Sequence, residues 1–300
     1  MTDDNAEYED PARMTVRRMP FSFTSSTDAH WNKSKPEFSQ LVNAASFGMP
    51  YLEPYLIKTM REARSKITVE RLKESLDLYV FQEAQHYQQH KKYNDQLAAR
   101  YDCVASIEKV LADDYKRLGK EKSLRFNIAY AEGFEAMALV IGHMLINDRE
   151  FLFGGSDTSV ASLVLWHFVE EIEHKNVTFE VFEHLDGTYR WRIFGLFYAA
   201  THIMSRTGQG YRQLLKEDGL WSSFASRLKL MKLLVRIFSK LLPGVLRICM
   251  PGYRPASVKD PEWASDWAEI FEHDPDQVAQ LDTNRFDSNI PIPLAILQYR

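Results

Sequence analysis

The chain has 300 residues and a formal net charge of −4, with 45% hydrophobic and 26% charged residues. This is the composition of an ordinary soluble protein, long enough to bury a large core, and its negative charge argues against nucleic acid as a partner. Cys103 and Cys249 are the only cysteines. Two cysteines exclude a disulfide framework and a cysteine-rich zinc site, although they allow a single bridge.

The N-terminal segment is acidic and polar, and residues 1–14 are predicted to be a disordered tail. It lacks the basic and apolar regions of a signal peptide, and no stretch of the chain approaches the roughly 18 uninterrupted apolar residues of a spanning helix. We therefore expect a cytoplasmic protein, either free or in contact with a membrane surface. The segment VRRMPFSFTSS that follows the tail has the pattern of an extended arm.

Residues 15–188 are predicted to form the bundle domain, with helical periodicity from Lys35 onward and no strand pairs or glycine-rich phosphate loops. Pro50 is expected near the start of a helix, where its missing N–H costs nothing. Asp157 is expected to cap the last helix and Asp186–Gly187 to end it. The pattern predicts an all-α bundle with helices at residues 35 to about 67, 69–100, about 107–117, 121–146 and 158–184.

Residues 189–275 are predicted to form a C-terminal helical extension packed on this bundle. Residues 191–205 are helical and unusually apolar, and residues 219–259 carry eight basic residues and no acidic ones. Such a basic amphipathic helix, expected to stop at Pro243, either docks on the bundle, faces a second subunit as in a homodimer, or lies on a membrane. A last helix is predicted at residues 261–273, and residues 276–300 are predicted to be a loosely ordered tail.

Two Glu-x-x-His motifs, Glu83-Ala-Gln-His86 and Glu171-Ile-Glu-His174, lie within long predicted helices. Residues three apart stack on one helix face, so each motif presents a carboxylate and an imidazole to the same metal. Two such helices, with one glutamate from each of two more, build the dinuclear metal site of ferritin-like bundles. The pattern therefore predicts a ferritin-like four-helix bundle with a carboxylate-bridged dinuclear centre.

Charge balance defines the rest of the ligand set, because two divalent ions carry four positive charges and four glutamates neutralise them. Glu53 and either Glu132 or Glu135 are the candidates on the other two helices. Carboxylate and imidazole donors suit two Fe ions or Mn, and Zn accepts the same donors. His167 adds a second imidazole to the helix of Glu171, as His-x-x-x-Glu-x-x-His.

Several of these residues have ordinary structural interpretations. Glu53 stands near a helix start, where acids are favoured, and His167 fits a core histidine held by a hydrogen bond. His90, one turn after His86, either orients a ligand or is a half-exposed polar residue, and the second interpretation is favoured. Glu170 and Glu173 lie off the apolar stripe and are expected to be solvated.

The ligand pattern resembles the histidine-rich di-iron centre of the p-aminobenzoate and arylamine N-oxygenases. Over residues 15 to about 275 the sequence is also similar to a bacterial family of predicted metal-dependent hydrolases. The segments that carry this similarity are VRRMPFSF, residues 81–90, AEGFEAMAL and WHFVEEIEHKNVTFEVF. The Glu-x-Phe motif of that family maps onto Glu132-Gly133-Phe134, which implies Glu132 rather than Glu135 as the ligand. Gly133 replaces the histidine that is more usual there.

These patterns support three functions. The favoured one is an O2-activating oxygenase, which needs O2, an external electron donor and an apolar or aromatic small molecule held in the bundle. The alternative is a hydrolase in which two ions activate water. The third is a protein that binds metal without catalysis. Ligands placed only on bundle helices favour the first, since hydrolytic two-metal sites tend to use aspartates and loops.

Overall fold

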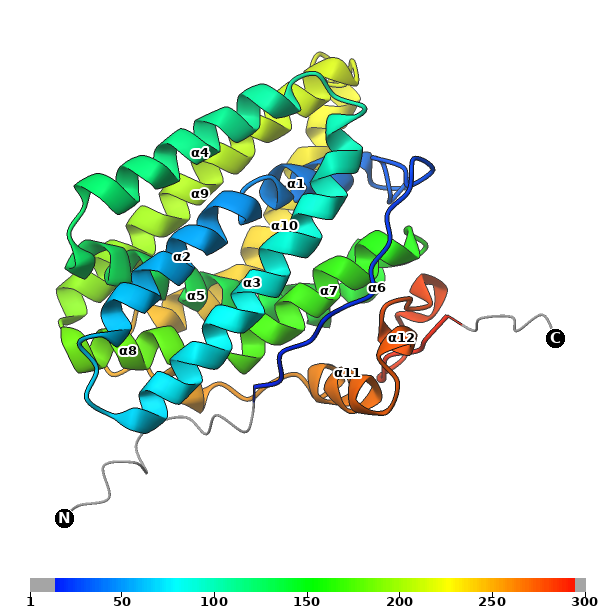
Figure 1. Cartoon of the computed structure of the whole chain (residues 1–300). Helices are drawn as coiled ribbons and strands as arrows, with labels where there is room; N and C mark the ends of the chain where they lie inside the picture. The colour runs from blue at the N-terminus through cyan, green and yellow to red at the C-terminus, as the bar shows by residue number, and fades with distance from the viewer. Residues whose placement is uncertain (1–13, 295–300) are drawn as a thin grey trace.

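The computed structural model describes residues 14–294, which form an all-helical bundle. In this described part the one extended pairing is an isolated bridge between Leu281 and Pro293. Four helices carry the predicted ligands and surround a common core (Figure 1). They are α2 (Met49–Arg64), α3 (Glu70–Ala98), α5 (Leu124–Asn147) and α7 (Thr158–Glu173).

The other helices flank this bundle (Figure 1). Helix α9 packs along α5, and α10 packs against α5 and α1. The shorter α11 and α12 lie beside α7 and the N-terminal arm, which crosses the bundle as an extended segment. The bounds are α1 (Pro36–Ser46), α4 (Val104–Glu121), α6 (Arg149–Phe153), α8 (Val177–Leu185), α9 (Tyr189–Glu217), α10 (Phe224–Ile248), α11 (Glu262–His273) and α12 (Pro275–Val278), with 3-10 turns at Pro255–Ser257 and Thr283–Arg285.

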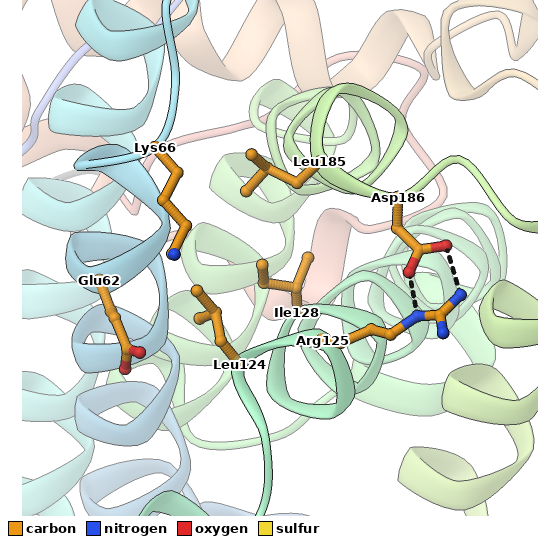
Figure 2. A pocket seen from close by; sticks show the side chains of 7 residues that line it. All are labelled: Glu62, Lys66, Leu124, Arg125, Ile128, Leu185 and Asp186. Carbon is orange, nitrogen blue, oxygen red and sulfur yellow. Dashed lines mark hydrogen bonds and ion pairs between the residues drawn. The ribbon is translucent and has the colours of Figure 1, made fainter.

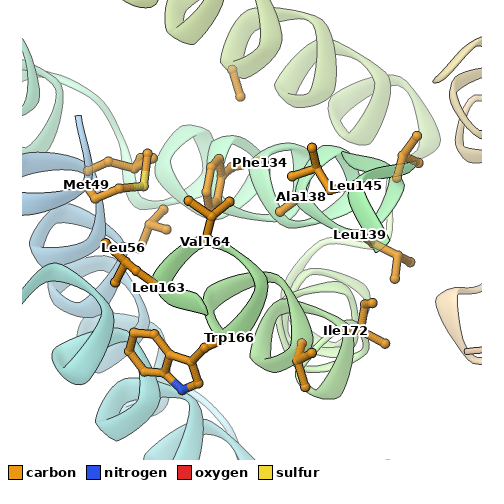
Figure 3. Close-up of a cluster of buried hydrophobic side chains, with 14 of the residues drawn as sticks. Met49, Leu56, Phe134, Ala138, Leu139, Leu145, Leu163, Val164, Trp166 and Ile172 are labelled. Carbon is orange, nitrogen blue, oxygen red and sulfur yellow. The ribbon is translucent and has the colours of Figure 1, made fainter. Parts of the chain in front are cut away.

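Helix α5 is the central helix of the core. It is the one helix of the described residues that is long and apolar enough to cross a membrane, and 83% of its most apolar window is buried inside the protein. Phe134, Ala138 and Leu139 pack among the side chains of α7 (Figure 3). On another side, a Cβ on Gly133 would lie 2.4 Å from the Leu196 nitrogen of α9. Gly133 therefore allows the backbones of α5 and α9 to touch.

Three sequence predictions need correction, two about where helices are interrupted and one about the C-terminal tail. The helix predicted over residues 158–184 is interrupted after Glu173 and resumes at Val177 as α8. Lys175, in the break, donates a 3.0 Å hydrogen bond to the Val258 carbonyl, which ties this turn to the segment after α10. Pro243 does not stop α10, because Leu241 and Ile248 anchor the helix on both sides of it.

The third correction concerns the C-terminal tail. Up to residue 294 it is packed rather than loose: Val278 and Leu281 are 0% exposed, and Phe286 is 3% exposed. These apolar side chains cover the start of α7, where Ser162 Oγ accepts a 3.0 Å hydrogen bond from the Leu281 N–H. The predictions for residues 1–13 and 295–300 lie outside the described part of the chain.

Candidate metal centre

Six of the seven predicted ligands come together inside the bundle. Two groups of side chains each place one ligand atom per residue within 4.8 Å of the others. The first group consists of the four residues of the two Glu-x-x-His motifs. The second consists of Glu53 of α2, His86 of α3 and His167 of α7, so His86 belongs to both. The six residues, all buried, are Glu53, Glu83, His86, His167, Glu171 and His174.

The donor atoms of this cluster lack protein partners. Both carboxylate oxygens of Glu53, Glu83 and Glu171 are buried without a hydrogen bond, as are His86 Nδ1 and both ring nitrogens of His174. A buried carboxylate without a hydrogen-bond donor or a cation is costly, on the order of several kcal/mol. These atoms fit divalent cations, which satisfy carboxylates and neutral imidazoles together.

Burial favours the neutral form of both kinds of group in the cluster, and a bound metal would reverse this effect only for the carboxyl groups. Burial and the nearby Glu171 carboxylate raise the pKa of Glu53 and Glu83 well above the usual range. Burial raises the pKa of Glu171 to about 7 and lowers the pKa of His174 to about 3. The imidazoles are thus neutral and ready to donate lone pairs, whereas the carboxyl groups need a cation to ionise.

The structure places Glu135, rather than the predicted Glu132, beside a cluster histidine. Neither glutamate belongs to the two groups of candidate ligands, and Glu132 Oε1 lies 3.9 Å from Arg192 Nη1 of α9. The Glu135 carboxylate instead places Oε2 3.5 Å from His174 Nδ1 and accepts a 2.7 Å hydrogen bond from the Tyr79 hydroxyl at Oε1. Glu135 is therefore the carboxylate that α5 offers to the cluster.

His167 faces the cluster through Nε2, which lies 3.0 Å from Glu171 Oε1. Its Nδ1 lies 3.1 Å from His90 Nε2. His90 is thus buried beside the site, contrary to the expectation of a half-exposed residue.

A chain of hydrogen bonds fixes the tautomer of His167. Asn94 donates from its amide to the Ser46 carbonyl, so its Oδ1 accepts the Ser46 hydroxyl proton at 2.6 Å. The Ser46 oxygen then accepts from His90 Nδ1 at 2.8 Å, which leaves His90 Nε2 to accept from His167 Nδ1. The Nε2 lone pair of His167 is consequently free to bind a metal.

His86 is oriented from behind by Glu170, which was expected to be solvated but is 0% exposed. His86 Nε2 lies 3.0 Å from Glu170 Oε2, so Nδ1 faces the cluster, 3.7 Å from Glu171 Oε1. Glu170 accepts in turn from Arg17 Nη1 at 3.2 Å. Burial raises the pKa of Glu170, and the Arg17 guanidinium opposes that rise.

Arg17 links this support to the outer segments of the chain. It forms a two-pronged pair with Glu173, at 2.7 and 2.6 Å, which keeps Glu173 largely covered rather than solvated. Its guanidinium also stacks on the aromatic side chains of α11, with Cζ 5.5 Å from the Trp267 ring and 5.1 Å from the Phe271 ring. The arm and α11 therefore hold the carboxylate that orients His86.

A family model described as "Predicted metal-dependent hydrolase" matches residues 15–259. The chain belongs to this family. No curated protein and no solved structure matches it. The matched residues include every helix that contributes to the cluster, together with Arg17 and α10. All candidate metal ligands therefore lie within the matched region.

Two surface pockets of this hydrolase family member lie away from the cluster. The first, about 290 Å³, lies beside the Arg125–Asp186 ion pair between α2, α5 and the end of α8 (Figure 2). The second is lined by Cys103 and by polar residues near the end of α9. Neither lining includes a cluster residue.

Proposed function

We propose that the buried cluster holds two divalent ions in a ferritin-like arrangement. Glu53 and His167 lie on one side, where each offers a ligand atom within 4.8 Å of the other, and Glu135 and His174 lie on the other. Glu171 approaches His167, His86 and His174, which suits a carboxylate between the two ions. Four glutamates, Glu53, Glu83, Glu135 and Glu171, balance the four positive charges.

The reaction supported by the family description is hydrolysis. Two divalent ions would supply a water of lowered pKa and would polarise an ester, amide or phosphate. The chain's own residues position this chemistry: Glu170 and Arg17 orient His86, and the His90–Ser46–Asn94 chain orients His167.

A second candidate is O2-dependent oxidation of an apolar or aromatic molecule by a di-iron centre, with electrons from an external donor. The observation that favours it is the donor set itself. Every carboxylate of the cluster lies on a bundle helix, no aspartate takes part, and three imidazoles are present. Such helix-borne glutamates and histidines are the pattern of ferritin-like di-iron and di-manganese proteins. Manganese and zinc accept the same donors.

One experiment separates the two reactions. Protein purified without added metal is assayed for bound metal, and the reduced protein is mixed with O2 while oxygen uptake and the optical spectrum are followed. A zinc-loaded, colourless protein that consumes no O2 and cleaves p-nitrophenyl esters or phosphates supports the hydrolase. Iron with stoichiometric O2 uptake supports the oxygenase. Stable metal with neither activity would support metal binding without catalysis and overturn both.

A further inference from the structure

Helix α10 carries a continuous row of exposed apolar side chains, here called the outer row. Its members recur every three or four residues, so those from Phe224 to Leu246 lie along one face of the helix over about 33 Å, at 1.5 Å per residue, and Met250 follows just past the helix end. Between 46% and 81% of each residue is exposed to solvent. The outer row is Phe224, Leu228, Met231, Val235, Phe238, Leu242, Leu246 and Met250.

The opposite face of α10 fixes the helix against the bundle, so the outer row cannot turn inward. Leu233, Leu241 and Ile248 are at most 8% exposed. Gly244 meets the Val140 side chain of α5 so closely that a Cβ there would lie 2.7 Å from it. Arg236 also forms two hydrogen bonds with Asp148, at 2.7 and 2.6 Å. Docking on the bundle therefore accounts for one face of α10 and leaves the outer row uncovered.

Exposure on this scale is unusual for a soluble monomer. Apolar surface removed from water contributes about 25 cal/mol per Å², and contiguous apolar patches larger than a few hundred Å² usually mark an interaction site. Eight large apolar side chains in one row exceed the scattered exposure that ordinary surfaces show. We therefore expect the outer row to be covered by a binding partner.

The charge beside the outer row selects that partner. Residues 219–259 contain eight basic residues and no acidic ones. At 100° per residue, Lys229, Lys232 and Arg247 fall along one border of the row, and all three are exposed. None of these three makes an ion pair with an acidic side chain within residues 14–294. A second copy packed row to row would bring like charges together, whereas anionic lipid headgroups would pair with them.

We propose that α10 docks this protein on an anionic lipid bilayer, with the outer row in the interface and the lysines at the headgroups. Interfacial helices bury their apolar face about 5–10 Å into the boundary between headgroups and acyl chains. Each basic residue near such a surface contributes about 1 kcal/mol. This inference rests on α10 alone and stands independently of the reaction at the metal centre.

Co-sedimentation of the full-length protein with vesicles tests the proposal. Vesicles of phosphatidylcholine alone are compared with vesicles containing a quarter phosphatidylserine, at 50, 150 and 500 mM NaCl. We expect binding to the anionic vesicles at low salt, release by high salt, and little binding to the neutral vesicles. No binding to anionic vesicles at 50 mM NaCl, or binding unaffected by salt, would overturn the proposal.

Two variants assign the binding to α10. The triple substitution Met231→Ser, Phe238→Ser, Leu242→Ser and the pair Lys229→Gln, Lys232→Gln should each weaken anionic-vesicle binding at least fivefold. Their matched controls are Phe81→Ser, an exposed aromatic residue of α3, and the exposed pair Lys116→Gln, Lys120→Gln of α4. The controls should bind as the unchanged protein does.

Light scattering after size exclusion tests the alternative, in which a second copy of the protein covers the outer row. A dimer that the Met231, Phe238, Leu242 triple variant converts to monomer, with vesicle binding unchanged, would assign the outer row to a second copy and overturn the membrane proposal. All substituted side chains are exposed, so the variants should keep the circular dichroism spectrum and melting temperature of the unchanged protein. A variant that loses vesicle binding with its fold intact supports the proposal.

Discussion

The metal cluster and the outer row depart from the usual distribution of side chains in opposite directions. At the cluster, charged groups are buried without protein partners; on α10, large apolar groups are exposed without cover. A folded chain tolerates either arrangement only when something outside the chain supplies the missing contacts. The cluster lacks positive charge, and the outer row lacks apolar contact and negative charge. The two regions therefore imply two different partners, a divalent cation and a lipid surface.

The largest expected effect comes from removing the carboxylates between the two ions. We expect the double variant Glu83→Gln, Glu171→Gln to retain less than half of the metal bound by the unchanged protein after loading with Fe(II) and dialysis. The measurement is metal per chain by mass spectrometry. Amides keep the side-chain volume and remove buried charge, so the metal-free variant should fold.

The comparison between the two regions supplies the controls for that experiment. Glu74→Gln, an exposed position on α3, should leave the metal content unchanged. The outer-row triple variant should also keep its metal, while the Glu83, Glu171 variant should keep its vesicle binding. Full metal content in the Glu83, Glu171 variant would remove the basis for the dinuclear centre.

A second prediction concerns the close crossing of α5 and α9. Gly133→Ala should lower the free energy of unfolding by about 1–3 kcal/mol or more, because the added Cβ would lie 2.4 Å from backbone atoms of α9. Gly208→Ala is the matched control on α9, since nothing lies within 4 Å of a Cβ there. It should be neutral or stabilise the protein by up to about 1 kcal/mol. Urea denaturation of both variants measures the difference, and equal stabilities would contradict the close crossing.

A third prediction tests whether the support behind His86 shapes the cluster. Glu170→Gln and Arg17→Met should each weaken metal affinity about 10–100-fold, as loss of a group that orients a metal-binding histidine commonly does. A competing chelator measures the affinity, and the spectrum of the Co(II)-loaded protein reports the changed ligand geometry. Arg18→Met, at an exposed neighbouring position, is the control. Unchanged metal affinity in both variants would show that Arg17 and Glu170 form an ion pair with no effect on metal binding.

The helical repeat and the local motifs were enough to predict the helices of the bundle and most of the candidate metal ligands. The three-residue spacing of Glu83 with His86, and of Glu171 with His174, puts each pair on one helix face wherever the helices pack. Glu132 and Glu135 share a face in the same way, so the repeat alone did not choose between them. The family motif favoured Glu132, but Gly133 turns that side of α5 toward α9, where Arg192 meets Glu132.

The residues that orient the ligands could not be predicted in the same way. Arg17 and Glu170 are 153 positions apart, and their pairing exists only because the N-terminal arm crosses α7. The chain from Asn94 through Ser46 to His90 likewise joins α3 to α1. No local pattern marks such contacts. The same holds for α10, where the sequence predicted an amphipathic helix, but only the packed structure separates its covered face from the outer row.

The last prediction concerns the pH dependence of the metal-free protein. Burial raises the pKa of Glu53, Glu83 and Glu135 well above the usual range and that of Glu132 to about 8. The folded state then holds protons that the unfolded chain releases above a pKa of about 4.3. Stability from these groups is therefore fully present at low pH and is lost as pH rises through the raised pKa values.

The cluster histidines change the free energy of unfolding with pH in the opposite direction to the carboxyl groups, but over a lower pH range. Burial lowers the pKa of His167 and His174 to about 3, so their contribution is present above the unfolded value and is lost as pH falls toward 3. Above about pH 6.5 these imidazoles are neutral in both states, and only the carboxyl groups titrate. Each contributes a slope of up to about 1.4 kcal/mol per pH unit. We expect the free energy of unfolding, measured in urea with chelator present, to fall between pH 6.5 and 8. Bound metal would displace the protons of the cluster carboxyl groups but not that of Glu132, so the metal-loaded protein should show a shallower decline. The same slope with and without metal would show that the cluster carboxylates are not the metal's partners.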